Sequence, residues 1–189
     1  MTQDHPINIL AISGSLRSDS SNTIILRTIV NLASTHVSVN IFSGLADLPF
    51  FSPELDKEGL IASVSNLRKL IAEADGVVIS TPEYAFGVPG VLKNALDWLV
   101  SSGELNEKPV FSISASPLNT GGEKALASLL LTLTALGTIE VGRLSIPNIK
   151  NKIDANKEIA DEDTMKALSG TLDSLINSIN NRKQNIARE

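Results

Sequence analysis

The strongest constraint on this chain is a fivefold alternation between short apolar runs and longer stretches with helical spacing. A buried strand reads as a short, nearly continuous apolar run, whereas a helix repeats its apolar residues every three to four positions. Strand–helix alternation favours a parallel sheet, because right-handed crossovers place the connecting helices on both faces. We expect strands at 7–12, 37–42, 76–80, 109–115 and within 138–147, and helices at 22–34, 59–74, 89–101, 121–136 and from about 161–163 onward.

The length of 189 residues fits a single α/β domain over 1–189, with a polar tail that we expect to fray from about Asn181. A closed eight-stranded barrel needs ~250 residues, so the sheet is expected to be open. The absence of cysteine excludes disulfides, thiolate metal sites and a cysteine nucleophile. Because His5 and His36 lack metal-ligand spacing, we expect no metal site.

The charge and hydropathy of the chain bear on which classes of partner and which cell compartment are expected. A formal net charge of −5 is a poor match to general nucleic-acid binding, so no nucleic-acid partner is expected. The first residues lack the basic start and long apolar core of a signal peptide. The most apolar stretch, 126–136, is far shorter than the ~20 residues of a membrane-spanning helix. We therefore expect a cytoplasmic protein without a membrane partner.

Three unusual loops follow the first, third and fourth predicted strands. In an open parallel sheet, ligands bind beyond the carboxyl ends of the strands, so all three loops are expected at one edge. Their convergence is more informative than any single loop. The loops occupy residues 13–23, 81–90 and 114–122.

The first loop has the composition of an anion-binding loop. It holds five serines together with Arg17, Asn22 and Thr23, directly before a predicted helix. Hydroxyls, helix N-terminal amides and a guanidinium all donate hydrogen bonds to phosphate oxygens. The alternative is a simple helix cap, with Asn22 as the capping residue. Gly14 lacks the partners of a dinucleotide fingerprint and no P-loop lysine follows, so the loop favours a mononucleotide.

The second loop combines aromatic residues with glycines. Tyr84 is the only tyrosine of the chain, Phe86 lies close to it, and Gly87 and Gly90 allow close backbone approach to a ligand. These aromatic side chains suit one wall of a site for a flat ring. They equally suit a cover over the end of the sheet, and the loop alone leaves both interpretations open.

Together these segments resemble the NADPH-dependent FMN reductase family. The pattern G-S-L-R-x-x-S-x-N at 14–22 and the pattern T-P-E-Y followed by P-G-V-L-K-N-A-L-D-W are similar to two motifs of that family, at the family's separation. The resemblance covers roughly 7–147 and implies a flavodoxin-like fold, with an open five-stranded sheet of order 2-1-3-4-5. The matching segments are 14–22, 81–84, 89–98, 47–49, 114–117 and 121–122.

The resemblance also implies a role for individual residues in binding FMN. The residues implied to hold the phosphate are Ser15, Arg17, Ser20, Asn22 and Thr23. Those implied to run along the isoalloxazine, partly through backbone amides, are Pro82, Glu83, Tyr84, Ala85 and Phe86. Those implied to close the far side of the flavin are Ser116, Gly121 and Gly122.

One residue departs from the family pattern. Many family members carry asparagine after the tyrosine, whereas this chain has Ala85. A side-chain contact to the flavin is lost there, while a backbone contact remains available. The departure leaves open a third interpretation, in which this chain is a relative of the family that has lost flavin binding.

The resemblance implies a flavin oxidoreductase. NADPH or NADH would pass a hydride to the flavin, which would then reduce a small acceptor such as a quinone, an azo compound, chromate or free flavin. Tyr84 is expected as a wall for the nicotinamide or the acceptor, and no side chain is assigned acid–base work. The alternative is a flavodoxin-like electron carrier that binds FMN without pyridine nucleotide. A different phosphate-loop pattern and stronger acidity are typical of such carriers, so the enzyme is favoured.

The predicted helix at 126–136 is apolar on most of its circumference. Such a helix either packs closely on the sheet or is shared with a second subunit. The family resemblance favours the second interpretation and implies a homodimer or homotetramer.

Overall fold

The computed structural model describes residues 6–57 and 61–186. Five parallel strands form one sheet in the order β2-β1-β3-β4-β5, which confirms the predicted architecture. The strands are β1 (Ile7–Ser13), β2 (Val37–Phe42), β3 (Gly76–Thr81), β4 (Pro109–Ala115) and β5 (Ile139–Ile146). The helices are α1 (Ser21–Leu32), α2 (Ala62–Glu73), α3 (Gly90–Asp97), α4 (Glu123–Ala135) and α5 (Glu162–Ile186), with short 3-10 turns η1 (Gly44–Asp47) and η2 (Ile149–Lys152).

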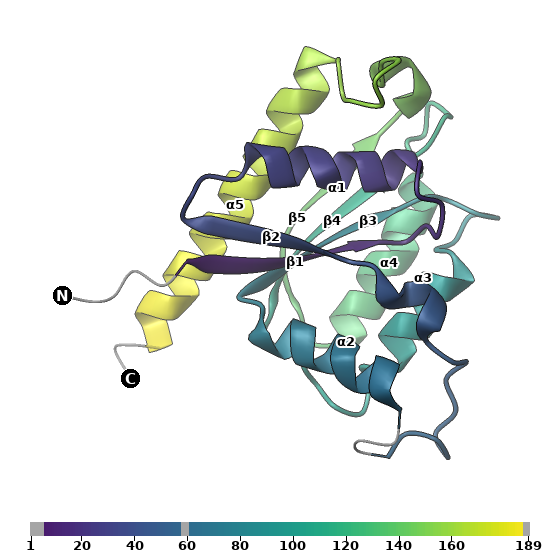
Figure 1. The fold of residues 1–189 in the computed structure, drawn as a ribbon, viewed down its shortest axis with the longest axis vertical. Coiled ribbons are helices and arrows are strands. Elements are labelled where there is room, and N and C mark those ends of the chain that lie inside the picture. The colour runs from purple at the N-terminus through teal and green to yellow at the C-terminus, as the bar shows by residue number, and fades with distance from the viewer. Residues whose placement is uncertain (1–5, 58–60, 187–189) are drawn as a thin grey trace.

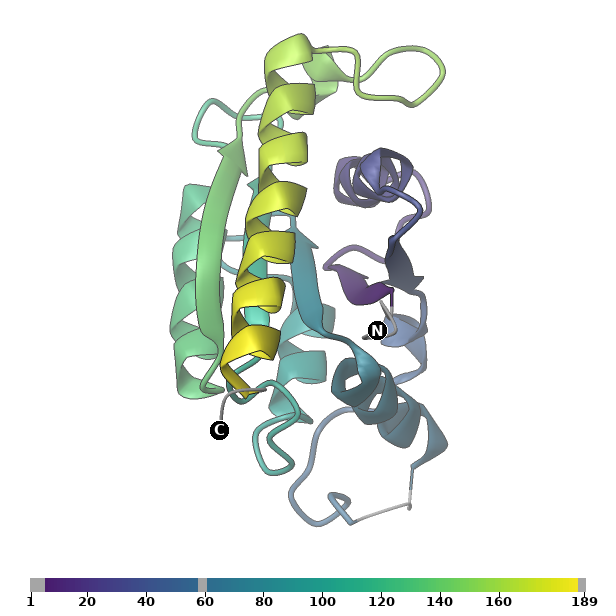
Figure 2. The same cartoon turned by 90° about the vertical axis from the view of Figure 1, so that its left-hand side faces the viewer.

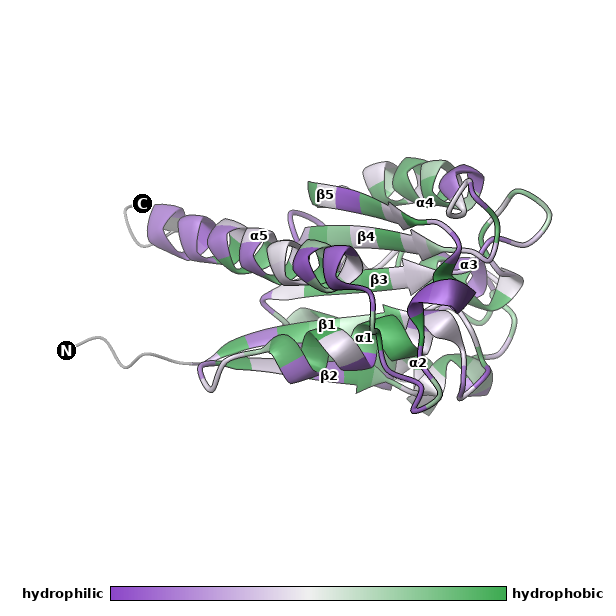
Figure 3. Ribbon diagram, turned by 90° about the horizontal axis from the view of Figure 1, so that it is seen from above, coloured by the Kyte–Doolittle hydropathy of each residue, from purple (hydrophilic) through white to green (hydrophobic). Residues whose placement is uncertain are grey.

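The sheet separates two hydrophobic layers. Along β1, Leu10 and Ile12 belong to one buried cluster while Ile9 and Ala11 belong to the other, because successive strand residues point to opposite faces. Helices α2, α3 and α4 cover the first face, and α1 and α5 cover the second (Figures 1 and 2). Figure 3 shows hydrophobic residues along the strands and a hydrophilic C-terminal end of α5. Burial on both faces explains the nearly continuous apolar runs of β1 and β3.

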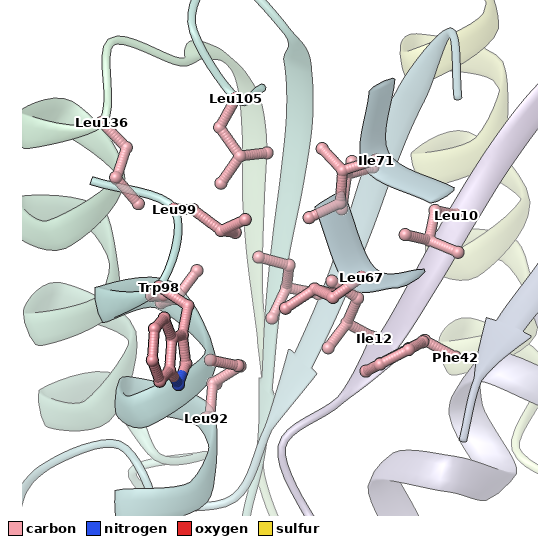
Figure 4. Packing of buried hydrophobic residues seen from close by; sticks show 14 of the residues in the cluster. Leu10, Ile12, Phe42, Leu67, Ile71, Leu92, Trp98, Leu99, Leu105 and Leu136 are labelled. Atoms are coloured by element: carbon pink, nitrogen blue, oxygen red, sulfur yellow. The ribbon is translucent and has the colours of Figure 1, made fainter. Parts of the chain in front are cut away.

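The first layer includes Trp98, at the end of α3 (Figure 4). Its indole Nε1 donates to the carbonyl of Pro49 at 2.9 Å, and its ring meets Phe51 edge-on with centroids 5.0 Å apart. Asn94 binds the same loop, donating to the Pro49 carbonyl and accepting from the amide of Phe51. The motif residues at 47–49 and 94–98 thus hold the loop after β2 against α3.

Helix α1 begins at Ser21, one residue earlier than expected. Ser20, not Asn22, is its N-cap: the Ser20 hydroxyl accepts from the Asn22 amide at 3.3 Å. Asn22 is therefore inside the first turn and buried, where its side-chain oxygen accepts from the Ser80 hydroxyl at 2.9 Å. The expectation of an Asn22 cap was wrong because β3 offers that side chain a buried partner.

Four further helix boundaries differ from the prediction. Helix α3 ends at Asp97 rather than near 101, and α4 begins at Glu123 because both preceding glycines have positive φ. The expected start of the helix at 59–74 falls partly outside the described residues, and α2 begins at Ala62. The expected fraying from Asn181 is wrong as far as Ile186, where α5 ends. Lys183 pairs with Asp75 at 2.8 Å, which ties the last turns of α5 to the start of β3.

Candidate functional site

A cavity of about 520 Å³ lies at the carboxyl edge of the sheet, within the range of small-molecule and cofactor sites. We call it the main cavity. It is lined by residues of all three loops singled out from the sequence, namely 17, 19–22, 82–84 and 115–117, together with Ile24. A fourth segment, at 149–157 after β5, completes the lining. In Figure 1 this edge lies opposite the two labelled termini, at the arrowheads of the strands.

Gly14 lets the first and second loops approach each other. Its amide donates to the Ser80 carbonyl at 2.8 Å, which extends the β1–β3 pairing beyond the strand. A Cβ at this position would lie 3.0 Å from the Thr81 hydroxyl and 3.1 Å from Leu92. Glycine is therefore required by close approach of the two loops rather than by an unusual φ angle.

The five residues predicted to hold a phosphate line two different cavities in the structure. Arg17, Ser20 and Asn22 line the main cavity at the N-terminus of α1, where backbone amides and the helix dipole favour an anion. Ser15 and Thr23 instead line a neighbouring cavity of about 410 Å³, which we call the side cavity. Arg17 lines both cavities.

Ser15 and Thr23 have partners within the first loop. The Thr23 and Ser13 hydroxyls are hydrogen-bonded at 2.9 Å, and the Ser15 hydroxyl accepts from the Arg17 amide at 3.3 Å. Both contacts shape the loop from inside. These two side chains therefore support the loop, whereas Ser20 both caps α1 and lines the main cavity.

In the second loop, Pro82, Glu83 and Tyr84 line the main cavity, whereas Ala85 and Phe86 do not. The amides and carbonyls of Tyr84 and Gly87 are mutually hydrogen-bonded at 3.0 Å, closing a tight turn. Ala85 and Phe86 occupy its tip with φ of 49° and 63°, a conformation that favours glycine or asparagine. Tyr84 is 55% exposed and Phe86 is 77% exposed, so the loop presents aromatic surface beside the cavity mouth.

Glu83 has a structural partner that the sequence did not indicate. Its carboxylate accepts from the amides of Lys124 and Ala125, at 2.9 and 3.0 Å. These amides belong to the first turn of α4, whose own N-cap, Gly122, supplies no side chain. Glu83 therefore caps α4 from another loop, and the carboxylate holds the second loop in place.

The third loop contributes Ser116 to the main cavity, while Gly121 and Gly122 lie outside its lining. The Ser116 hydroxyl accepts from the Leu118 amide at 3.1 Å. The two glycines have φ of 63° and 82° and form the turn into α4. A Cβ on Gly122 would lie 3.3 Å from the Ser114 side chain, so these glycines allow the loop to pack against β4.

The segment after β5 is the part of the site that sequence reasoning missed. Ile149, Lys150, Ile153 and Lys157 all line the main cavity. The family patterns quoted above end before them, and they carry no motif of their own. The available signal was topological: β5 is parallel to the other strands, so the segment that follows it also starts at the ligand-binding edge.

One ion pair joins this segment to the first loop. The Lys157 ammonium donates to the Asp19 carboxylate at 2.8 Å. This hydrogen bond, together with the positive charge of Lys157, lowers the pKa of Asp19. Asp19 and Glu83 are the two carboxylates in the cavity lining, and both are thus engaged by protein donors.

Within the described residues, no cluster of acidic or histidine side chains is arranged to hold a metal ion. In the same part of the chain, no helix has both the length and the apolar content required to cross a bilayer.

Comparison with known proteins extends the structural picture. A family model described as NADPH-dependent FMN reductase matches residues 7–151. A quinone reductase of Escherichia coli strain K12 is 35% identical over 172 residues, covering 88% of this chain and 92% of the relative. A 2-hydroxy-1,4-benzoquinone reductase of a Burkholderia species is 33% identical over 173 residues, covering 88% of this chain and 93% of the relative.

Among solved structures, the flavoenzyme FerB of Paracoccus denitrificans, an NAD(P)H:(acceptor) oxidoreductase, superposes with a TM-score of 0.79. It is 29% identical in sequence, and the match covers 93% of this chain and 98% of FerB. The family match over most of the chain, the relatives above 30% identity and the shared fold agree with one another. The chain belongs to the NADPH-dependent FMN reductase family.

Proposed function

We propose that the main cavity binds the FMN of an NAD(P)H oxidoreductase. The observation that carries this proposal is the composition of the cavity lining. The first loop contributes Arg17, Ser20 and Asn22 with the N-terminus of α1, a donor set suited to a phosphate. The second and third loops contribute Pro82, Tyr84 and Ser116, of which the Tyr84 side chain suits contact with a flat ring. A volume of about 520 Å³ suits a cofactor of this size.

When bound, FMN would supply the redox chemistry of the family, hydride and electron transfer between NAD(P)H and an acceptor. The residues of this chain bind and orient it. Because Asp19 is paired with Lys157 and Glu83 caps α4, neither carboxylate of the lining is placed as a free general acid or base. Tyr84, exposed at the cavity mouth, is proposed as a wall for the nicotinamide or the acceptor.

A quinone is the acceptor that we propose. The relatives from Escherichia coli and Burkholderia are named as quinone reductases, and flat aromatic acceptors suit a site bordered by Tyr84 and Phe86. Steady-state rates with a benzoquinone, a naphthoquinone, an azo dye and free FMN as acceptors would test this choice. Faster turnover with free FMN than with either quinone would contradict it.

The visible spectrum, recorded before and after anaerobic addition of NADPH and then NADH, tests the redox function. We expect oxidised-flavin bands that bleach with at least one of the two donors. Bands that persist with both donors would indicate an electron carrier instead. Protein that gains no flavin spectrum after incubation with FMN would contradict the cofactor site.

Two arginine variants test which cavity holds the phosphate. Arg17→Ala is expected to weaken FMN binding at least tenfold, because a charge-assisted phosphate contact is lost. Arg27 lines the side cavity and a third cavity that also includes Asp19 and Lys157, but not the main cavity, and serves as the control. Arg27→Ala is expected to change FMN affinity less than twofold, and a larger loss in Arg27→Ala than in Arg17→Ala would place the phosphate in the side cavity.

We further propose a homodimer formed through α4. One face of this helix packs on the sheet through Leu126, Leu129 and Leu133, whereas Leu131 on the outer face is 75% exposed. No charged residue occurs between Lys124 and Glu140, so the outer face of α4 is uncharged beyond its first two residues, Glu123 and Lys124. Light scattering is expected to give the mass of a dimer or larger assembly for the wild type and of a monomer for Leu131→Glu. A monomeric wild type at micromolar concentration would contradict this interface.

A further inference from the structure

The segment between η2 and α5 forms a short, well-braced hairpin. Ile153 and Ile159 pair as an antiparallel bridge, and the Asp154 amide donates to the Glu158 carbonyl at 2.9 Å. The Asp154 carboxylate accepts from the amides of Asn156 and Glu158, both at 2.9 Å. These contacts define where the residue at the hairpin tip, Lys157, is presented.

Lys157 is presented to the first loop. Its ammonium contacts the Asp19 carboxylate at 2.8 Å, across 138 residues of sequence. The two side chains are 57% and 54% exposed, and both residues line the main cavity. An ion pair this exposed contributes little to folding, so its location beside the cavity calls for another explanation.

Asp19 places a negatively charged carboxylate in the proposed phosphate site. It lies between Arg17 and Ser20, two of the residues proposed to face the phosphate. A phosphate monoester carries about −1.5 to −2 charges at neutral pH, so an unpaired carboxylate at this position repels it. Lys157 offsets that repulsion most strongly because it places a positive charge on Asp19 from outside the loop, and Arg27 and Arg17 contribute smaller effects of the same sign.

We propose that Lys157 is a positioning residue for phosphate-bearing flavin: its contact with Asp19 neutralises the first loop and fastens the 153–159 hairpin over the phosphate end of the main cavity. This inference rests on the proposed binding of FMN in that cavity. It assigns selectivity for FMN over riboflavin in part to a residue outside the segment matched by the family model, which ends at 151.

The test compares FMN with riboflavin, which has the same ring and no phosphate. Apo-protein is titrated with each flavin by quenching of flavin fluorescence at ~10 mM salt, where the screening length is about 30 Å. Lys157→Gln is expected to weaken FMN binding about tenfold and riboflavin binding less than twofold, since only the phosphate senses the missing charge. The FMN effect is expected to shrink at ~1 M salt, where charges are screened within about 3 Å.

Three further variants isolate the charge effect. Lys157→Arg keeps the positive charge and is expected to retain wild-type FMN affinity. The double variant Asp19→Asn with Lys157→Gln removes both charges and is expected to recover most of the FMN affinity lost in Lys157→Gln. Lys166, an exposed lysine of α5 outside the cavity lining, provides the matched control: Lys166→Gln is expected to bind both flavins as the wild type does.

The outcomes separate this inference from the proposed function. Wild-type protein that binds FMN with the same affinity as Lys157→Gln overturns the inference and leaves the function intact. Equal losses of FMN and riboflavin in Lys157→Gln also overturn it, because the lysine would then act through packing of the hairpin. Wild-type protein that binds neither flavin overturns both.

Discussion

Substitution of Glu83 by alanine is expected to destabilise the protein through a helix some 40 residues away. In the folded chain the Glu83 carboxylate accepts two hydrogen bonds from the first turn of α4, at 2.9 Å from Lys124 and 3.0 Å from Ala125. The N-cap residue of that helix is Gly122, which has no side chain to replace the lost acceptor. Glu83→Ala therefore leaves two first-turn amides without their protein partner.

The size of the effect follows from known capping energies. Loss of an N-capping side chain costs about 0.5–2 kcal/mol, and charge-assisted bonds fall toward the upper end of that range. We expect Glu83→Ala to lower the free energy of unfolding by about 2 kcal/mol. For a chain of this length, 1 kcal/mol corresponds to roughly 2–4 °C, so the melting temperature is expected to fall by about 4–8 °C. Glu83→Gln retains a neutral oxygen acceptor and is expected to lose about half as much.

Urea unfolding of the apo-protein, followed by circular dichroism, measures this loss without contribution from flavin. Glu123→Ala is the matched control, because Glu123 is an exposed acid on the same helical turn with only the helix dipole to lose, about 0.3–1 kcal/mol. The apo Glu83→Ala protein is expected to unfold at lower urea with an unchanged slope. Equal stability of Glu83→Ala and Glu123→Ala would refute the capping role and return Glu83 to a direct role at the flavin.

Two further changes test the local geometry. Ala85→Gly is expected to raise the free energy of unfolding by about 0.5–1 kcal/mol, because the left-handed conformation at φ 49° costs an L-residue ~1–2 kcal/mol. In urea unfolding, the control Ala127→Gly on the exposed side of α4 should instead lower the free energy of unfolding. A less stable Ala85→Gly protein would contradict the turn conformation. A second prediction concerns Asp161, whose pKa is lowered to about 2 by a hydrogen bond from Lys152, the largest cause, and by hydrogen bonds from Thr164. Because this pKa lies below the ordinary value of 3.8, the stabilisation by ionised Asp161 is complete above pH 3.8 and is lost as pH falls through about 2. The difference in melting temperature between the wild type and Asp161→Asn should therefore disappear over that pH range. A difference that stays constant with pH would exclude the ionic contribution.

The fold was predictable because its determinants are local. The apolar runs of β1 and β3 are short and nearly continuous, which is what a strand buried on both faces requires. The boundaries were less predictable, since they depend on contacts between distant segments. Asn22 has the composition of a cap, yet Ser80 on β3 takes its side chain into the core. Asn181 begins a polar stretch, yet Lys183 pairs with Asp75 and α5 continues.

The candidate site was predictable to the extent that it is built from contiguous loops. Arg17, Ser20 and Tyr84 line the main cavity as their loops indicated. The role of Ser15 and Thr23 at the phosphate stays a prediction, because composition does not distinguish a hydroxyl directed at a ligand from one that bonds within its own loop. In the structure Thr23 contacts Ser13, a partner within the loop.

The segment after β5 shows why sequence patterns find only part of such a site. Residues 153–159 read as an ordinary polar turn, and nothing in them specifies a ligand. Their significance arises from parallel topology, which returns each strand to the same edge, and from one contact between Lys157 and Asp19. An acidic residue in an otherwise anion-binding loop indicates that a compensating cation should be sought elsewhere in the fold, because a buried or half-buried phosphate does not tolerate a neighbouring unpaired carboxylate. In this chain that electrostatic argument points to the three lysines that follow the last strand, at 150, 152 and 157, of which Lys157 pairs with Asp19.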